Sequence, residues 1–192
     1  MTTTVHRRTP DRQIVQPETP FTDRIRGPVL AITRIATGLI FLWAFVDKTF
    51  GLGYATPGER AWIRGGSPTA GFLGGVDVGP FQSAFRALAG NPFLDWLFMI
   101  ALLGIGVAVI MGAGLRIAAV AGSLMMILMW AAEWPPALLN AAGEATRSTN
   151  PIVDYHLIYA LVLITLAVTG AGRFWGVGRR WERMVDRQHW LV

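Results

Sequence analysis

The sequence of 192 residues contains no cysteine. This absence excludes disulfides, thiolate metal ligands and cysteine nucleophiles. Only three histidines are present, and two of them, His6 and His189, lie in polar terminal segments, so a haem held by paired histidines is not expected. The sequence also has no Glu-x-x-His pair of the kind that builds di-metal sites in helical bundles. We therefore expect no metal site and no haem.

Charged residues are also scarce, at 15% of the chain against 53% hydrophobic residues. Soluble domains carry roughly a quarter charged residues, and a mean hydropathy of +0.43 likewise indicates a membrane protein. The net charge of +5 would suit nucleic acid, but the basic residues cluster beside apolar runs and form no single stripe. We expect the lipid bilayer to be a partner and expect no nucleic acid.

Four long apolar runs are present, at residues 28–46, 93–111, 115–134 and 152–171. Each is close to the roughly 20 residues that a helix needs to cross a hydrocarbon core. The sequence therefore predicts an all-α fold, an integral membrane four-helix bundle. We expect this domain at residues 28–175, between a polar tail at residues 1–27 and a basic tail at residues 176–192.

The basic residues predict the orientation of the bundle. Eleven of the seventeen Lys and Arg residues lie in the two tails and the short turn between the second and third runs, and five lie in the other two connections. Because basic residues are enriched on the cytoplasmic side, both termini should face the cytoplasm. Helical spans also favour an inner membrane, since outer-membrane proteins span as β-barrels.

The connection between the first two runs is long and rich in Gly and Pro. Long connections usually carry structure or function, and four aromatic residues in this one, Trp62, Phe72, Phe81 and Phe85, would otherwise be exposed to water. We therefore expect residues 51–91 to be ordered over the outer rim of the bundle.

Small residues recur every four positions in two of the runs, Gly104, Ala108 and Gly112 in one and Ala118 and Gly122 in the next. This spacing lets helix backbones approach closely in lipid. It predicts packing within one bundle, and a contact between copies is the alternative.

The predicted topology gathers polar and amphipathic residues at the outer ends of the helices. The candidates are Trp43, Asp47, Lys48, Trp130, Glu133, Asp154, His156 and Tyr159. One interpretation is that these residues are interface anchors and that Asp154 is a helix cap. The other is an outward-facing pocket, because anchoring alone requires no carboxylates, lysine and histidine together.

In the pocket interpretation, His156, Glu133 and Asp47 are the candidate catalytic residues, which would move protons. The other candidates would bind the substrate, with Lys48 supplying charge. Because an unpaired buried charge is costly, we expect Lys48 within salt-bridge or one-water distance of Asp47, Glu133 or Asp154.

Arg34 lies inside the first run, where a charge is costly. It is either a structural anchor that extends toward the headgroups or a ligand for an anionic or quinone head group.

The segment "LAITRIATGLIFLWAFVDK" at residues 30–48 resembles the start of DoxX/DoxD-type membrane proteins. Members of that family typically have an arginine, a glycine four residues later and a lysine about ten further on, and Arg34, Gly38 and Lys48 fit this spacing. One departure is Phe45, near which relatives often have a glycine. The four-helix layout and the long first connection also agree, so that the resemblance covers residues 28–175.

The resemblance implies a bacterial inner-membrane protein with one of two functions. Some relatives are membrane subunits of thiosulfate:quinone oxidoreductase, which joins two thiosulfates into tetrathionate and passes electrons to quinone. Others are accessory proteins that hold redox partners at the membrane. We expect a quinone-linked oxidoreductase subunit, with quinone as the cofactor and a partner subunit or a homo-oligomer; the alternative is a non-catalytic anchor or scaffold.

Overall fold

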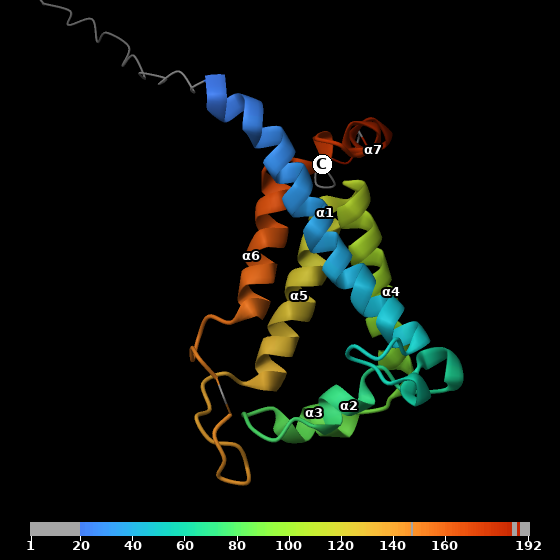
Figure 1. Ribbon diagram of the computed structural model, residues 1–192, viewed down its shortest axis with the longest axis vertical. Helices are drawn as coiled ribbons and strands as arrows, with labels where there is room; N and C mark the ends of the chain where they lie inside the picture. Colours follow the sequence, from blue (N-terminus) through green and yellow to red (C-terminus); the bar gives the residue numbers. More distant parts are fainter. Residues whose placement is uncertain (1–19, 147, 186–187, 189–192) are drawn as a thin grey trace, which may run out of the picture.

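A computed structural model describes residues 20–146, 148–185 and 188 of the chain, with side chains from residue 24 on. This part of the chain is all-helical, with seven α-helices and no strand. The four longest helices are α1 (Pro20–Phe50), α4 (Pro92–Met111), α5 (Leu115–Glu133) and α6 (Tyr155–Val168). Figure 1 shows them side by side, with the two longer connections at one end. The all-α prediction is confirmed.

Three of the four predicted spans are helices long and apolar enough to cross a membrane, at Arg24–Phe50, Pro92–Met111 and Leu115–Glu133. The fourth run forms the shorter α6, of 14 residues. Helix α6 begins late because Asp154 caps it at Tyr155, and it ends before Gly170, whose φ of 62° is left-handed. Helix α1 begins at Pro20, inside the predicted polar tail, and residues 1–19 lie outside the described part.

The long helices pack in pairs, α1 along α4 and α5 along α6, and α4 also contacts α5. Their inner faces form one apolar core. Its most buried members are Phe41, Met99, Leu102, Ile105, Val109, Met126, Leu163 and Leu166. Phe45, the departure from the DoxX/DoxD pattern, is half-buried against this core, so that its bulk fills interior space.

Close contact between α1 and α4 depends on Gly38 and Gly106. A Cβ on Gly38 would lie 2.9 Å from the Gly106 carbonyl oxygen, and one on Gly106 would lie 2.8 Å from the backbone of Leu42. The predicted stripe is therefore wrong for Gly104, which is exposed and where a Cβ would meet nothing within 4 Å. The prediction holds for Gly122, which faces Leu163 of α6.

The connection between α1 and α4 carries four short helical segments: η1 (Gly58–Arg60), η2 (Trp62–Arg64), α2 (Ala70–Gly74) and α3 (Gln82–Leu88). Trp62 packs edge-to-face on Trp96 of α4, with ring centroids 4.5 Å apart. Phe72 and Phe85 are half-buried, and Phe81 is exposed. The connection is structured, as its aromatic residues predicted.

Two buried carboxylates fix the ends of this connection. Asp47 accepts hydrogen bonds from the backbone N–H groups of Tyr54 (3.3 Å) and Ala55 (3.1 Å) just after α1. Asp95, in the first turn of α4, accepts from the Ser67 hydroxyl and from both the N–H and the hydroxyl of Thr69. Sequence reasoning singled out Asp47 for chemistry and did not single out Asp95.

At the other end of the helices, the fully buried Arg34 binds backbone carbonyls. Its Nη1 donates to Val109 (2.6 Å) and to Ile110 at the end of α4, and its Nη2 donates to Phe174 (3.2 Å) and Trp175 (3.1 Å). The last carbonyls of a helix lack partners within the helix and carry partial negative charge. Arg34 therefore joins α1 to the end of α4 and to the segment after α6.

Glycines make room for this arrangement. A Cβ on Gly112 would lie 3.0 Å from Nη1 of Arg34, and one on Gly176 would lie 3.0 Å from Nη2. The same end carries η3 (Ala171–Arg173) and α7 (Gly178–Met184), which lie in or beside the predicted basic tail. An ion pair from Arg173 Nε to Glu182 (2.6 Å) joins η3 to α7, and the hydrogen bond and charge of Glu182 raise the pKa of Arg173 above its ordinary value.

Candidate functional site

The candidate site is built where α5 ends and α6 begins. Helix α5 ends at Glu133 because Trp134 is left-handed (φ 45°) and two prolines follow, which cannot continue the helix. Helix α6 begins at Tyr155 because one carboxylate oxygen of Asp154 accepts from the N–H groups of His156 (3.0 Å) and Leu157 (3.2 Å). These two helix ends bring Glu133, Asp154 and His156 together.

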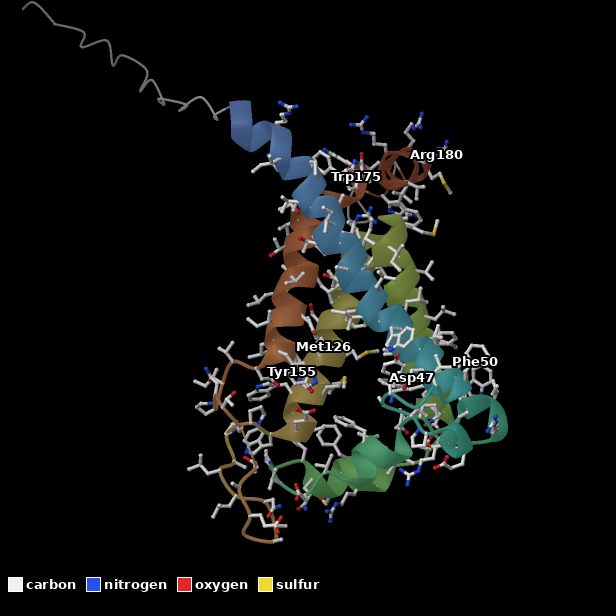
Figure 2. The ribbon with its side chains drawn as sticks, in the orientation of Figure 1. Asp47, Phe50, Met126, Tyr155, Trp175 and Arg180 are labelled. Carbon is white, nitrogen blue, oxygen red and sulfur yellow. The ribbon has the colours of Figure 1, made fainter. Side chains whose placement is uncertain are left out.

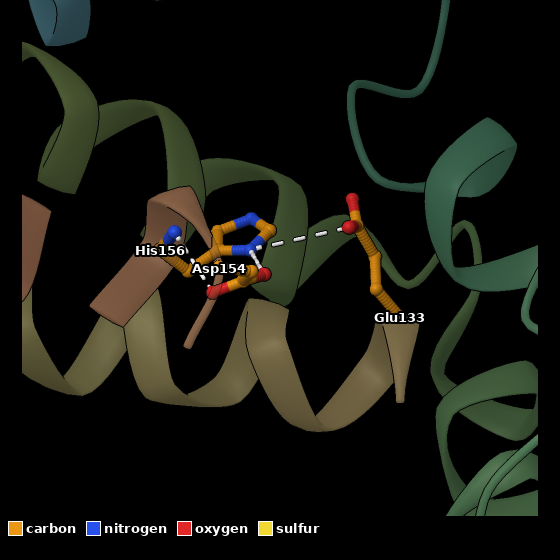
Figure 3. Close-up of side chains that lie close together, drawn as sticks. All are labelled: Glu133, Asp154 and His156. Carbon is orange, nitrogen blue, oxygen red and sulfur yellow. Dashed lines mark hydrogen bonds and ion pairs between the residues drawn. The ribbon is translucent and has the colours of Figure 1, made fainter. Parts of the chain in front are cut away.

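The imidazole of His156 is fully buried. Its Nδ1 lies 2.7 Å from Asp154 Oδ2 and 4.0 Å from Glu133 Oε2 (Figure 3). Its Nε2 is buried and has no hydrogen-bond partner in the described part of the chain. An unpaired buried nitrogen is costly, so that this atom is available to a ligand.

Glu133 connects the buried imidazole with the surface. Its Oε1 accepts a hydrogen bond from the Tyr155 hydroxyl (2.9 Å), which leaves Oε2 on the side of His156. The Glu133 side chain is 38% exposed, against 1% for that of His156. Ligand-type atoms of Glu133, Asp154 and His156 all lie within 4.8 Å of one another.

Two cavities adjoin this group. The larger, of about 960 Å³, lies between the connection that carries α2 and α3 and the connection before α6, and Ala132 and Glu133 line it at the end of α5. Its described ionisable lining residues are all acidic: Asp77, Glu133 and Glu144. The smaller, of about 210 Å³, is lined by Glu133, Asp154 and Tyr155 among others. Water can therefore reach the carboxylates of the site.

Lys48 and Asp47 do not join this group. Figure 2 shows Asp47 and Tyr155 on different sides of the same end of the molecule. The half-buried Lys48 has its Nζ 5.9 Å from the ring centroid of Phe98. No direct ion pair joins Lys48 to Asp47, Glu133 or Asp154 among the salt bridges of the described residues. A direct pair is therefore absent among the described residues, and the alternative of a one-water distance stays a prediction. The Asp47 carboxylate binds the backbone after α1.

The remaining candidates are divided between the two sides. Trp43 is exposed and packs on Tyr54. Trp130 donates from Nε1 to the Ile152 carbonyl (3.0 Å) and so holds the segment that leads to Asp154. Tyr159 packs on the core, with its ring 6.1 Å from that of Tyr155. Arg34 lies at the other end of the helices and has no contact with the group.

Sequence reasoning missed two residues that the structure places at the site, Asp77 and Glu144. It expected Tyr155 at the outer rim beside Asp154 and His156 but assigned it no role. Asp77 and Glu144 lie in irregular connections without a periodic pattern, so only the tertiary fold brings them to the cavity that Glu133 lines.

The arrangement has a defined chemical capacity. Three atoms with lone pairs, His156 Nδ1, Asp154 Oδ2 and Glu133 Oε2, face one another on the cavity side of the ring. Such a convergence is stable only when a proton or another cation lies among them. On the other side of the ring, the buried Nε2 has no hydrogen-bond partner within the described residues.

No family model matches the chain, and no curated protein or solved structure is significantly similar to it. The DoxX/DoxD resemblance is therefore a prediction that rests on the motif at residues 30–48.

Proposed function

We propose that the chain is a DoxX/DoxD-like membrane subunit of a quinone-linked oxidoreductase of the thiosulfate:quinone type, in a bacterial inner membrane. The observation that carries this proposal is the buried His156, which has on one side carboxylates that line cavities and on the other a Nε2 without a partner in the described part of the chain. Quinone head groups reside in the apolar phase, yet their oxygens need hydrogen-bond partners and protons. A buried imidazole with a link to water supplies both.

The membrane part of the proposal rests on exposed apolar surface. Large apolar side chains project outward along α4 and α5, among them Phe93, Leu97, Ile100, Leu103, Val120, Leu124, Ile127 and Leu128. A soluble monomer rarely exposes so continuous an apolar surface. Helices α1, α4 and α5 are therefore proposed to face lipid.

Helix α6 is proposed to complete a four-helix transmembrane bundle. Its 14 residues rise about 21 Å, less than the hydrocarbon thickness of about 30 Å. Its exposed residues Ile158, Leu161, Ile164 and Val168 nonetheless form an apolar stripe at helical spacing. The segments on either side of α6 would span the remaining hydrocarbon thickness.

In the proposed topology both termini are cytoplasmic, and the Glu133–Asp154–His156 group lies at the outer face. Protease accessibility tests this orientation. Tags at residues 1 and 192 should resist external protease in intact spheroplasts, whereas a tag inserted at Gly143, in the exposed turn of the connection before α6, should be removed. Cleavage at either terminus would overturn the topology.

The proposed reaction divides between this chain and a partner. Joining two thiosulfates into tetrathionate releases two electrons, and reduction of quinone to quinol consumes two electrons and two protons. The acidic residues that line the larger cavity disfavour an anionic substrate there, and the chain has no cysteine. We assign thiosulfate oxidation to the partner subunit, and quinone binding with proton supply to this chain.

The quinone is proposed to bind at Nε2 of His156. Protons would pass from cavity water through Glu133 and Asp154 to the imidazole, whose Nε2 hydrogen-bonds a quinone oxygen. Met129 and Met126 lie about one and two turns before Glu133 on α5, and their flexible side chains would move to admit a quinone ring.

The test is quinone turnover in the native complex, isolated in mild detergent through a tag on this chain. Thiosulfate should reduce a short-chain quinone analogue, and His156→Gln should slow this reaction on the order of a hundredfold while the partner still co-purifies. Glu59→Gln, an exposed carboxylate in η1, is the matched control and should keep the wild-type rate. An unchanged rate in His156→Gln would reject the assignment.

The alternative function, a non-catalytic anchor or scaffold, is favoured by the rigid way in which Asp47 and Asp95 hold the long connection. A fixed loop surface suits recruitment of a partner. The same preparation separates the two functions, because a scaffold would retain the partner but show no quinone reduction in the wild-type complex.

A further inference from the structure

We propose that Glu133 Oε2, Asp154 Oδ2 and His156 Nδ1 bind one divalent cation of the Zn²⁺ class. This inference deepens the proposed function. The metal site itself does not depend on that function, whereas the effect of the cation on quinone binding rests on it. The expectation of no metal came from the absence of local sequence motifs. The three residues here come from two helix ends and are separated by more than twenty positions between Glu133 and Asp154.

The distances suit a shared cation. Zn²⁺ takes ligands at roughly 2.0–2.2 Å, so that two ligand atoms on one ion lie about 3–4 Å apart. Nδ1 of His156 is 2.7 Å from Asp154 and 4.0 Å from Glu133, and one ligand-type atom from each of the three residues lies within 4.8 Å of the others. The 2.7 Å contact is a hydrogen-bond distance, so a cation that replaces its proton must part Nδ1 and Asp154 by a few tenths of an ångström. Glu133, the part-exposed last residue of α5, need move only slightly to complete the set.

Protein contacts already orient the ligands. The second oxygen of Asp154 accepts from the backbone N–H groups at the start of α6, and the second oxygen of Glu133 accepts from the Tyr155 hydroxyl. In each carboxylate one oxygen is thus held and the other is turned toward His156. Such outer contacts fix ligand orientation in known metal sites.

The surroundings favour a cation over other ligands. The described ionisable residues of the larger cavity are Asp77, Glu133 and Glu144, which raise the local concentration of cations. One imidazole with two carboxylates suits Zn²⁺ and its neighbours in the transition series better than Mg²⁺ or Ca²⁺, which prefer oxygen alone. Three protein ligands leave a fourth position open toward the cavity water.

The unpaired Nε2 of His156 lies across the ring from these three atoms, and a cation on Nδ1 would determine what Nε2 can bind. A cation on Nδ1 places the ring proton on Nε2, which then becomes a hydrogen-bond donor. Metal-bound histidines almost always donate from their other nitrogen, yet Nε2 is fully buried and has no acceptor in the described part of the chain. In the proposed function the missing acceptor is a quinone carbonyl oxygen.

The presence of the cation would determine whether Nε2 of His156 binds quinone or quinol more tightly. Without the cation, Nδ1 donates to Asp154 (2.7 Å) and Nε2 is an acceptor, which suits the hydroxyl of a quinol. With the cation, Nε2 is a donor and suits the carbonyl of a quinone. Bound Zn²⁺ should therefore tighten quinone binding relative to quinol. Because it occupies the proposed proton route through Glu133 and Asp154, it should also slow quinone reduction.

The experiment measures Zn²⁺ binding to the purified full chain in lipid nanodiscs, by competition with a chromophoric chelator. His6 and His189 are replaced by alanine and the tag contains no histidine, so that His156 is the only imidazole present. We expect one Zn²⁺ per chain. Glu133→Gln and Asp154→Asn should each weaken binding more than tenfold, and Tyr155→Phe about tenfold through the lost contact to Glu133.

Two features keep the result interpretable. Asparagine is as good a helix cap as aspartate, so that Asp154→Asn should leave α6 folded, and helical content by circular dichroism checks this. Glu59→Gln is the matched control and should bind Zn²⁺ as the parent does. Equal affinity in the parent, Glu133→Gln and Asp154→Asn proteins, or no Zn²⁺ bound at all, would overturn the site.

A second titration uses a short-chain quinone and its quinol, with and without Zn²⁺. Tighter quinone binding in the presence of Zn²⁺ supports the inference in full. Site-specific Zn²⁺ binding without binding of either head group supports the metal site and rejects the proposed function. Head-group binding without site-specific Zn²⁺ binding rejects the metal site and leaves the proposed function standing.

Discussion

Two fully buried ionisable side chains, Arg34 and His156, lie at opposite ends of the same helices and are treated differently by the fold. Arg34 directs both terminal nitrogens to four backbone carbonyls of two segments. His156 has carboxylates on one side of its ring and no described partner on the other. Figure 2 shows the two ends, with Trp175, whose carbonyl accepts from Arg34, at one and Tyr155 at the other.

The difference teaches how to separate a structural charge from a functional one. Both residues lie within predicted apolar runs, and the sequence left Arg34 open between anchor and ligand. Both residues have one buried nitrogen without a partner among the described residues, Nε of Arg34 and Nε2 of His156. The Arg34 guanidinium is otherwise committed to carbonyls in a glycine-lined space, whereas the partners of His156 are carboxylates that line a cavity. We therefore expect substitutions at the Arg34 end to cost stability and those at the His156 end to cost activity.

The largest effect is expected for Arg34→Met. Hydrogen bonds to a charged group contribute about 1.5–3 kcal/mol each, so the loss of four should destabilise the protein by about 3 kcal/mol or more even after relaxation. Arg34→Lys should recover little, because an ammonium cannot reach two pairs of carbonyls with planar geometry. The unfolding midpoint in detergent measures both, and a wild-type midpoint for Arg34→Met would contradict the structural role.

The next effect is expected for Gly172→Ala at the same end. A Cβ there would overlap the carbonyl oxygen of Gly112, and overpacking of this kind costs about 1–3 kcal/mol. Gly104→Ala is the matched control, because a Cβ there meets nothing and alanine favours a helix by about 0.5–1 kcal/mol over glycine. The comparison would break if Gly104→Ala lowered the midpoint as much as Gly172→Ala did.

A smaller and local effect is expected for Asp95→Ala. It leaves the Ser67 and Thr69 donors without their acceptor, a loss of about 1–3 kcal/mol that is confined to the connection between α1 and α4. Limited proteolysis should cut residues 51–91 faster than in the wild type while α4 and α5 stay protected. Unchanged cleavage would mean that Asp95 does not hold the connection.

The smallest effect on stability is expected for His156→Leu. Leucine has a similar volume and removes the unpaired Nε2. Asp154 Oδ2 loses Nδ1 as its partner, but the other oxygen keeps its backbone donors, so that the unfolding free energy should fall by only about 1 kcal/mol. Quinone turnover should nevertheless be lost. If His156→Leu were as destabilising as Arg34→Met, the histidine would be structural and the contrast between the two ends would fail.

Much of the fold was predictable, because lipid-compatible helices leave long apolar runs in the sequence. The runs at 93–111 and 115–134 match α4 and α5 closely, and the first run lies within α1. The fourth run was overestimated, since apolar residues continue beyond Val168 while Gly170 ends the helix. Gly106 was missed because hydropathy does not say which side of a helix meets its neighbour.

The candidate site was predictable only in part. Glu133, Asp154 and His156 were expected at one rim because their helix ends share one side of the predicted topology, and the structure brings them within hydrogen-bonding or ion-pair range. Asp47 and Lys48 were expected beside them on the same reasoning. Depth along a helix is readable from sequence, whereas the position around the bundle is not, and α1 turns these two residues toward its own connection and α4.

The sequence by itself determined the helical, apolar character of the chain and the presence of charges that lipid would not tolerate alone, because composition and run length carry that information. Only the tertiary structure decided what each charge does. The carbonyls that Arg34 binds lie 75 to 141 positions away in the sequence, and His156 and Glu133 come together at the ends of two different helices. Such long-range partners depend on how helices rotate and pack, which no local pattern specifies.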